Sequence, residues 1–372
     1  MSAGETLRIY SLAEERLLQI AGGGGPFLLR ARGDRIHLEF KGRLALLNGG
    51  IRFRALGDAV RLNGTPYRGA IDVVASAGRL WVVNSVRLEG YLRGVVGREI
   101  PPKWPQAALQ AQAVAARTFT LLIRAQAERS SARRSSGGPP LFHLTAGTGD
   151  QVYGGIPAED PAIDAAVSST EGQVLVYRGV LARAFFHAAS GGHTEAVGAV
   201  WPSIDDPYIR GVPVPHERSD PAQAWESRVR LAELRAALAR EGRTLGPIQD
   251  VRIEGRTPSG RASLVRVSHR NGQIRLPATL IRRILGYTRI RSTLFTLQRD
   301  RDFVVFRGRG YGHGVGMSQR GARYLAEGGM NYAEILAFFY PGTALRKAEE
   351  AAFPDEEFLV PQDIDDLSRL LR

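Results

Sequence analysis

The chain has 372 residues, of which 44% are hydrophobic and 23% charged, as in an ordinary globular protein large enough for more than one domain. The absence of cysteine excludes disulfides, thiolate metal sites and a cysteine nucleophile. No apolar run approaches the roughly 18 residues that a membrane-spanning helix needs.

The net charge is +13, and 47 of the 50 basic residues are arginines, the lysines being Lys41, Lys103 and Lys347. The arginines are spread along the whole chain, whereas the basic residues of a nucleic-acid-binding protein gather on one element. We therefore expect no nucleic-acid partner; such a binder would need a contiguous arginine face and a steep salt dependence. A basic surface would also suit another anionic polymer, such as a cell wall.

Residues 1–72 predict a β-rich region. The runs LRIYSL, RIHLEF and IRFRAL alternate apolar and polar residues, and turns such as AGGGGPF and LNGG separate them. Two similar runs, IDVVAS and LWVVNSV, follow up to about residue 90. The N-terminus has no basic segment followed by an apolar one, so no signal peptide is recognisable in this sequence.

Two helices are predicted next, in 87–97 and 105–127. Pro105 suits the first turn of the second helix, where a missing N–H costs nothing. That helix, AALQAQAVAARTFTLLI, is apolar nearly all round, which predicts that most of its sides are buried. Gln112 and Arg117 would then need hydrogen-bond partners, and Arg117 would need an anion.

Glu99, between the two helices, has two interpretations. It could be the anion that pairs with the long helix, which would make it a structural residue. Alternatively, the apolar residues before it and the Ile-Pro-Pro after it would partly desolvate its carboxyl, an environment that suits a general acid.

A catalytic core is expected in two parts, 73–215 and 297–345. The first part includes a polar loop, AERSSARRSSGGPP (127–140), and strands in 172–179 and 181–190.

Between the two parts of the core, residues 216–296 predict an inserted α+β subdomain. It would contain helices in RVRLAELRAALAREG and LPATLIRRILG and a hairpin across PSG. The second part of the core would end with the helix of NYAEILAFFYPG, where Asn331 and Glu334 have the spacing of a capping box. Residues 346–372 predict an acidic amphipathic tail. The fold class is therefore α+β.

Two further segments could carry chemistry. In RGRGYGHGVGMSQRGA, glycines at every second residue surround His313 and allow close backbone approach; the segment is a cleft wall or holds a structural histidine. In FFHAASGGHTEAV, Ser190 begins a tight polar turn, but the GxSxG elbow of a serine hydrolase is absent. The spacing of His143, His187, His193 and His313 does not match a zinc motif.

Five segments together resemble one family. They are GVVGREIPPKWPQAALQAQAVAARTFTL, TAGTGDQVYGG, FFHAASGGHTE with VWP, DDPYIRGV, and GRGYGHGVGMSQRGARYLAEGGMNYAEILAFFYPGT. In this order they resemble the sporulation stage II protein D family, also called the amidase-enhancer (LytB) family of peptidoglycan lytic transglycosylases. The resemblance runs from about residue 73 to 343.

The resemblance implies that the catalytic glutamate is Glu99. It implies that the residues lining or supporting a glycan cleft are Gln112, Arg117, Gln151, Tyr153, Ser190, Gly191, Gly192, His193, His313 and Gln319. Some members bind zinc through histidine and cysteine near the segment that contains His143. Because this chain has no cysteine, we expect no cofactor and no metal.

The implied reaction cleaves the β-1,4 bond between N-acetylmuramic acid and N-acetylglucosamine in peptide-stripped glycan strands, without water. One acid suffices, whereas a hydrolase in the usual scheme needs two. Asp150 is the alternative acid, and Trp104, Tyr153 and Tyr311 could stack on sugars or belong to the core. The resemblance also implies an extracytoplasmic location, and it leaves open a non-catalytic module that binds glycan and stimulates a partner cell-wall amidase.

Overall fold

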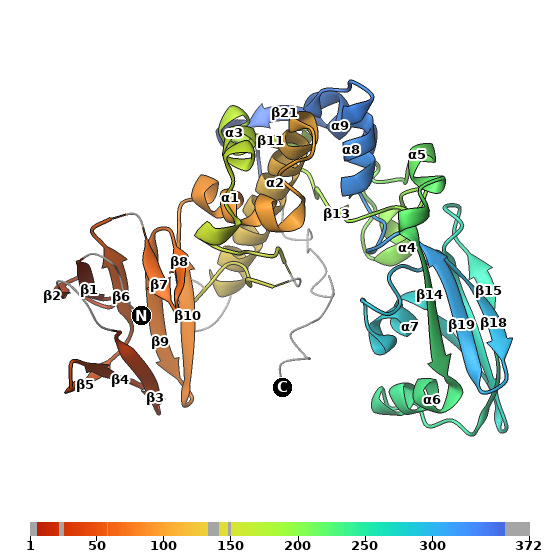
Figure 1. Cartoon of the computed structure of the whole chain (residues 1–372), viewed down its shortest axis with the longest axis horizontal. Helices are drawn as coiled ribbons and strands as arrows, with labels where there is room; N and C mark the ends of the chain where they lie inside the picture. Colours follow the sequence, from red (N-terminus) through yellow and green to blue (C-terminus); the bar gives the residue numbers. More distant parts are fainter. Residues whose placement is uncertain (1–5, 22–25, 58, 133–140, 148–149, 354–372) are drawn as a thin grey trace. The chain divides into compact units, whose positions relative to one another are not determined.

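The computed structural model describes residues 6–21, 26–57, 59–132, 141–147 and 150–353 (Figure 1). The chain divides into two compact units. Of the described residues, unit 1 comprises those up to Lys103 and Ile123–Glu171, and unit 2 comprises Trp104–Leu122 and residues 172–353. The predicted α+β class with a β-rich N-terminal part is confirmed.

Unit 1 begins with ten strands and continues with helices. The strands are β1 (Leu7–Ser11), β2 (Leu17–Ala21), β3 (Leu28–Arg32), β4 (Arg35–Phe40), β5 (Arg43–Asn48), β6 (Ile51–Ala55), β7 (Val60–Leu62), β8 (Thr65–Tyr67), β9 (Ala70–Ser76) and β10 (Arg79–Ser85). The helices are α1 (Leu88–Glu99), the last part of α2 (Gln106–Ala132), the 3-10 helix η1 (Ile156–Ala158) and α3 (Pro161–Ser169).

The N-terminal strands form an antiparallel five-stranded sheet in the order β10-β9-β6-β1-β2 and a three-stranded sheet β3-β4-β5. Alternating apolar residues of both sheets, among them Ile9, Ile36 and Phe53, share one buried core. Because β9 and β10 belong to the five-stranded sheet, the β-rich region extends to Ser85 and not to residue 72.

Helix α2 is longer than the sequence predicted. Arg124 and Glu128 form an ion pair one turn apart (2.8 Å), and the good helix formers around them carry the helix through Ala132. The expected loop at 127–140 is therefore wrong for its first six residues, and 133–140 lie outside the described residues. The predicted burial is confirmed, since Leu109, Val114 and Ala116 are fully buried.

Unit 2 holds the remaining elements. The strands are β11 (Gln173–Tyr177), β12 (Val180–Leu181), β13 (Phe186–His187), β14 (Ala224–Arg230), β15 (Ile248–Arg256), β16 (Ala262–His269), β17 (Gly272–Pro277), β18 (Phe295–Asp300), β19 (Phe303–Arg309), β20 (Met317–Ser318) and β21 (Ala344–Lys347). The helices are α4 (Val197–Val200), α5 (Pro215–Arg218), η2 (Pro221–Gln223), α6 (Leu231–Arg240), α7 (Ala278–Leu285), α8 (Gln319–Glu327), α9 (Tyr332–Phe339) and η3 (Ala348–Glu350).

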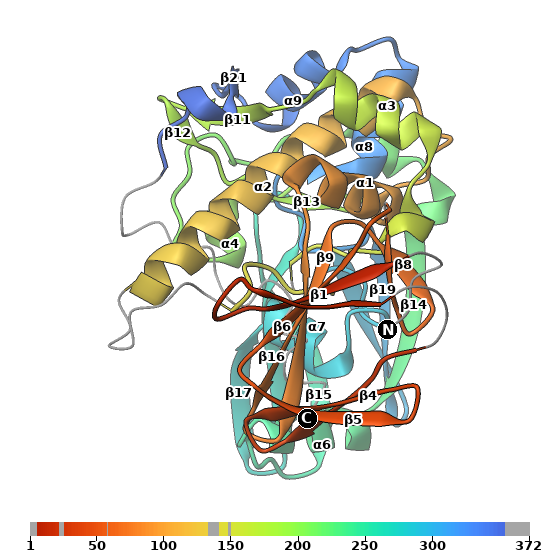
Figure 2. The same ribbon diagram turned by 90° about the vertical axis from the view of Figure 1, so that its left-hand side faces the viewer.

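The core of unit 2 contains two small sheets. Strand β11 lies between β12 and β21 (Figure 2), and β13 pairs in parallel with β20. The expected strand at 181–190 is reduced to two short pieces, because the Ala184 and Phe185 N–H groups turn back to the carbonyls two residues before them. The capping box of Asn331 and Glu334 is confirmed at the start of α9.

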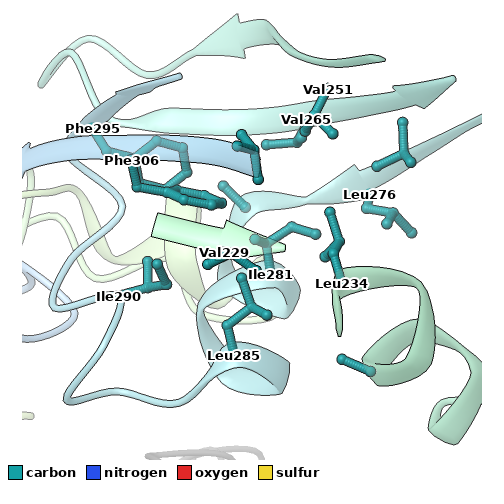
Figure 3. Close-up of a cluster of buried hydrophobic side chains, with 14 of the residues drawn as sticks. Val229, Leu234, Val251, Val265, Leu276, Ile281, Leu285, Ile290, Phe295 and Phe306 are labelled. Carbon is teal, nitrogen blue, oxygen red and sulfur yellow. The ribbon is translucent and has the colours of Figure 1, made fainter. Parts of the chain in front are cut away.

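The insert has its own core. Two three-stranded sheets, β14-β19-β18 and β15-β16-β17, pack with α6 and α7 around residues such as Val229, Leu234, Val265, Ile281 and Phe306 (Figure 3). The predicted hairpin is confirmed as β15 and β16.

The insert extends further along the chain than the predicted boundary at 296. Strand β19 pairs along its whole length with β14, from Ala224 opposite Arg309 to Arg230 opposite Phe303. The strand predicted as the return to the core is therefore the central strand of the insert's own sheet. Of the tail, β21 pairs with β11, and residues 354–372 lie outside the described residues. Within the described chain, none of the helices has the length and apolarity to span a membrane.

Candidate functional site

Glu99 is the last residue of α1, where the following prolines stop the helix. Its side chain is partly buried, and Oε1 accepts a hydrogen bond from the Val152 N–H (3.2 Å). This bond ties the predicted catalytic carboxylate to the Gln151–Tyr153 segment, which the sequence assigned to the same site. Glu99, Gln151 and Tyr153 are therefore brought together in unit 1.

Two glycines of α1 let this segment lie directly on the helix. A Cβ on Gly94 would be 2.6 Å from the Tyr153 ring, and one on Gly97 would be 1.9 Å from the Ala158 carbonyl oxygen. The Gly154 N–H also donates to the Gly94 carbonyl (3.1 Å). The sequence did not identify the role of these helical glycines, which only the packing reveals.

An aromatic and amide cluster supports the segment. The Tyr91 hydroxyl donates to the buried Gln151 side chain (3.3 Å), and the Tyr91 and Tyr153 ring centroids are 5.0 Å apart. The Tyr153 hydroxyl donates to Asn84 Oδ1 (2.8 Å). Burial raises the pKa of Tyr91, and the negative charges of Asp150 and Glu99 raise it further, so Tyr91 stays protonated.

Asp150 has a different environment. Its Oδ2 accepts two hydrogen bonds from Thr145, one from the backbone N–H and one from the hydroxyl, both 2.7 Å long. These bonds fix the turn that precedes the Gln151–Tyr153 segment.

The long helix carries Gln112 and Arg117 into the interior of unit 2. Arg117 is fully buried, and its Nη1 donates to the Gln173 carbonyl on β11 (3.1 Å). Gln112 is 1% exposed, and its amide has no hydrogen-bond partner among the described residues. A pairing of Arg117 with Glu99, one of the two interpretations of Glu99, stays untested, because the two residues belong to different units.

The turn at Ser190-Gly191-Gly192 is held by a buried network that the sequence did not reveal. Glu217 of α5 is fully buried; its Oε2 accepts from the Ser190 N–H (2.7 Å) and its Oε1 accepts from the Ser318 hydroxyl. Buried Arg261 of the insert donates to the carbonyls of Ser190 (2.6 Å) and His193 (2.7 Å).

The geometry of this turn agrees with the absence of a nucleophile elbow. The Ser190 hydroxyl accepts the Gly192 N–H (3.1 Å), as in a tight polar turn. Gly191 and Gly192 have φ angles of 76° and 122°, which favour glycine. Glu217 is 27 residues and Arg261 is 71 residues after Ser190 in the sequence, and such isolated charged residues give no motif, so sequence analysis missed both.

The glycine-alternating loop places His313 against His187. The ring centroids are 5.5 Å apart, and the Trp201 ring is 5.2 Å from His313. His313 Nδ1 accepts the Val315 N–H (3.0 Å), whereas His187 Nδ1 donates to the Val315 carbonyl (3.1 Å), so each neutral tautomer is fixed. Burial, with the charge of Arg282, lowers the pKa of His313 to about 3.

The remaining residues that the sequence suggested are Gln319, His193, Trp104 and Tyr311. Gln319 is buried at the first position of α8, next to the N-cap residue Ser318. His193 is partly buried, with Nδ1 2.6 Å from the Thr194 carbonyl. Trp104 lies under Arg323 and exposed Tyr311 under Arg291, so each ring faces a guanidinium.

The described residues contain no group of three histidine, aspartate or glutamate side chains arranged to hold a metal ion. His143 lies in unit 1 with its Nε2 3.5 Å from Glu128 Oε1, and a single carboxylate beside one histidine does not make a zinc site.

Comparison with known proteins shows two matching family models. The model described as stage II sporulation protein (SpoIID) matches residues 76–177, which include α1, α2 and the Gln151–Tyr153 segment. A domain of unknown function (DUF8618) matches residues 215–316, nearly the same span as the insert.

Three relatives cover most of this chain. Stage II sporulation protein D of Bacillus subtilis is 31% identical over 72% of this chain and 76% of its own length. An uncharacterized protein of Brachyspira hyodysenteriae is 30% identical over 77% of this chain and 73% of its length. The amidase enhancer of Bacillus subtilis is 29% identical over 90% of this chain, which spans about half (51%) of that protein.

Proposed function

This chain belongs to the stage II sporulation protein D family, and from that membership we propose that it is a peptidoglycan lytic transglycosylase. Its substrate is the glycan strand of the cell wall with the stem peptides removed, and it acts outside the cytoplasm. The reaction cleaves the β-1,4 bond between N-acetylmuramic acid and N-acetylglucosamine and leaves a 1,6-anhydro end.

Glu99 is the single acid of this mechanism. Its carboxylic proton passes to the glycosidic oxygen as the C1–O bond breaks, which releases the N-acetylglucosamine hydroxyl. The resulting carboxylate then accepts the proton of the muramic C6 hydroxyl as that oxygen bonds to C1. The proton returns to Glu99, no water is consumed, and the enzyme is ready for another cycle.

The observation that carries the proposal is the position of Glu99. It ends a helix with its carboxylate held by the Val152 N–H, next to buried Gln151 and the tyrosine cluster. A partly buried, backbone-anchored carboxylate has a fixed direction, which a proton donor to a bound sugar requires.

Two other acids, Asp150 and Glu217, are poorer candidates. Asp150 is committed to both hydrogen-bond donors of Thr145. Glu217 is fully buried, and its two oxygens are occupied by Ser190 and Ser318. A one-acid reaction therefore suits this chain better than hydrolysis by two carboxylates.

The test is digestion of peptide-stripped peptidoglycan by the wild type and by Glu99→Gln, with products identified by mass. We expect an anhydro product about 18 Da lighter than its hydrolytic counterpart, and none from the variant. Reducing-end products would refute the transglycosylase, and equal activity of Glu99→Gln would refute the role of Glu99. Asp150→Asn is the matched control and should keep the product.

A second function is favoured by one comparison, the similarity over 90% of this chain to a protein named amidase enhancer. In that function the chain binds glycan and stimulates a partner cell-wall amidase without cleaving. If neither the wild type nor Glu99→Gln yields products but both bind the stripped glycan and accelerate an added amidase equally, the enhancer function is correct.

A further inference from the structure

A groove in unit 2 lies between the Ser190–Gly192 turn and the insert. Its volume is about 780 Å³, within the usual range for sites that bind small ligands. Gly191, Gly192 and His193 line one side, and residues of β14, β18 and β19 with the 256–260 turn line the other. Residues of both the core and the insert therefore line the groove.

Four arginines and one glutamate face this groove: Arg218, Arg256, Arg307, Arg309 and Glu226. The only carboxylate among its lining residues, Glu226, pairs with Arg307 (2.7 Å). The charged side chains of the lining thus have a net charge of three positive units, so an anionic ligand is the electrostatic complement.

The remaining three arginines are held without a carboxylate among the described residues. Arg256 donates to the carbonyls of Gly260 (2.7 Å) and Phe295 (3.1 Å), and Arg309 donates to those of Glu217 (3.2 Å) and Asp220 (2.8 Å). Arg218 is exposed and makes no hydrogen bond or ion pair within the described chain. Carbonyl bonds orient the guanidinium groups but leave their charge unneutralised.

The floor of the groove is apolar. Trp225 is 8% exposed and packs against Gly308, where a Cβ would lie 2.2 Å from the indole. Phe295 and Leu294 complete the floor. An aromatic floor below directed guanidinium groups suits sugar rings that carry acidic groups, since the ring face packs while carboxylates accept hydrogen bonds.

We propose that this groove binds an acidic glycan through sugar-borne carboxylates, with Arg218 and Arg256 as the recognising residues. On the proposed function, on which this inference rests, those carboxylates are the lactyl groups of muramic acid, which are free only where no stem peptide is attached. The insert thereby selects peptide-free glycan. The arginines line one groove of about 780 Å³ and form no extended track among the described residues, which favours a few sugar rings over a nucleic-acid backbone.

The experiment measures binding by calorimetry in the Glu99→Gln background, so that the probe is not cleaved. The probes are a peptide-free tetrasaccharide of alternating N-acetylglucosamine and N-acetylmuramic acid and the same tetrasaccharide with its carboxylates reduced to alcohols. A single-stranded oligonucleotide serves as the third probe. Arg218→Gln and Arg256→Gln are compared with Arg235→Gln, an exposed arginine of α6 that does not line the groove.

We expect the native tetrasaccharide to bind more tightly than the reduced one. Each groove variant should weaken binding of the native probe about fivefold, the value of a partly exposed charge pair, and leave the reduced probe unchanged. Arg235→Gln should match the parent protein. Equal affinity for the two tetrasaccharides, or equal effects of Arg218→Gln and Arg235→Gln, would overturn the proposal, as would tighter Arg218-dependent binding of the oligonucleotide.

The two proposals can fail separately. If the protein with Glu99 intact releases anhydro products but the groove variants bind the native probe normally, the groove proposal fails and the enzyme stands. If the protein prefers the native probe and Arg218→Gln weakens binding of that probe, but the protein with Glu99 intact does not cleave glycan, the groove proposal stands and the transglycosylase proposal fails.

Discussion

Gly97 offers a sharp test of how α1 positions Glu99. In Gly97→Ala the new Cβ would lie 1.9 Å from the Ala158 carbonyl oxygen, and real contacts of this kind do not fall below 3.0 Å. The obstacle is backbone, not the end of a flexible side chain, so η1 must retreat from α1 by about 1.1 Å. The segment that donates to Glu99 precedes η1 by only four residues and should move with it.

The magnitude follows from two opposing terms. Overpacking of this kind costs about 1–3 kcal/mol, and alanine is favoured over glycine in a helix by about 0.5–1 kcal/mol. Gly97→Ala should therefore destabilise the protein by roughly 1–2 kcal/mol. Gly90 in the same helix is the matched control, because its Cβ would meet nothing closer than 3.4 Å. Gly90→Ala should stabilise by about 0.5–1 kcal/mol.

The assay is thermal unfolding together with glycan digestion. The two variants should differ by about 1.5–3 kcal/mol, so at about 2–4 °C per kcal/mol for a protein unit of this size their midpoints should differ by roughly 3–12 °C. Gly97→Ala should also lose activity, whereas Gly90→Ala should retain it. If Gly97→Ala is as stable and as active as Gly90→Ala, the close packing of α1 against η1 does not position Glu99.

Three further perturbations probe unit 2 and its last helix. Glu217→Leu should destabilise by about 3–5 kcal/mol in urea unfolding, because buried Arg261 loses a nearby negative charge and the Ser190 N–H loses its shorter acceptor. Glu217→Gln loses the same charge but keeps an acceptor, so it should cost less than Glu217→Leu, and the exposed control Glu349→Leu should cost about 1 kcal/mol or less. Burial lowers the pKa of His313 from 6.5 in the unfolded chain to about 3, so the contribution of neutral His313 to the free energy of unfolding is complete above about pH 6.5 and falls as the pH drops toward 3. Near pH 5 the free energy of unfolding should be lower by on the order of 1–2 kcal/mol. If His313→Gln loses stability with the same slope over this pH range, the prediction is wrong. Asn331→Ala removes a capping box and should cost about 1 kcal/mol by thermal unfolding, with exposed Asn271→Ala as the comparison.

Local rules predicted much of this fold. The capping box at Asn331, the hairpin across PSG and the burial of the long helix each follow from residues within one turn or one strand pair. The predictions failed where the place of an element in the fold depends on a partner that is distant in the sequence. Strand β19 was assigned to the core because its sequence shows only a strand, and nothing local reveals that β14, some 80 residues earlier, is its neighbour.

The candidate site shows the same division. The context of Glu99 left a structural and a catalytic interpretation open and the family resemblance favoured the second, and the structure adds the Val152 N–H that orients its carboxylate. Glu217 and Arg261 were missed because each is one charged residue in an unremarkable stretch, and their importance lies in burial against the Ser190 turn. A sequence gives residue types at fixed spacing, but which polar groups share a buried space is a property of the packing.

The pairing of β14 with β19 has a consequence for how this chain can be altered. Ala224 and Arg309 are register partners, so the chain leaves the core and returns to it at neighbouring points. The loop of some 80 residues between these points can therefore change in length at a small cost in loop entropy, provided that Arg261, which holds the Ser190 and His193 carbonyls, is kept. The point where the chain returns is bonded to the Ser190–Gly192 turn, because the Gly310 N–H donates to the Gln223 carbonyl and the Gln223 side chain accepts from the Gly191 N–H. The insert thus joins the core through residues that also shape the Ser190–Gly192 turn, so its length can vary more freely than its points of attachment.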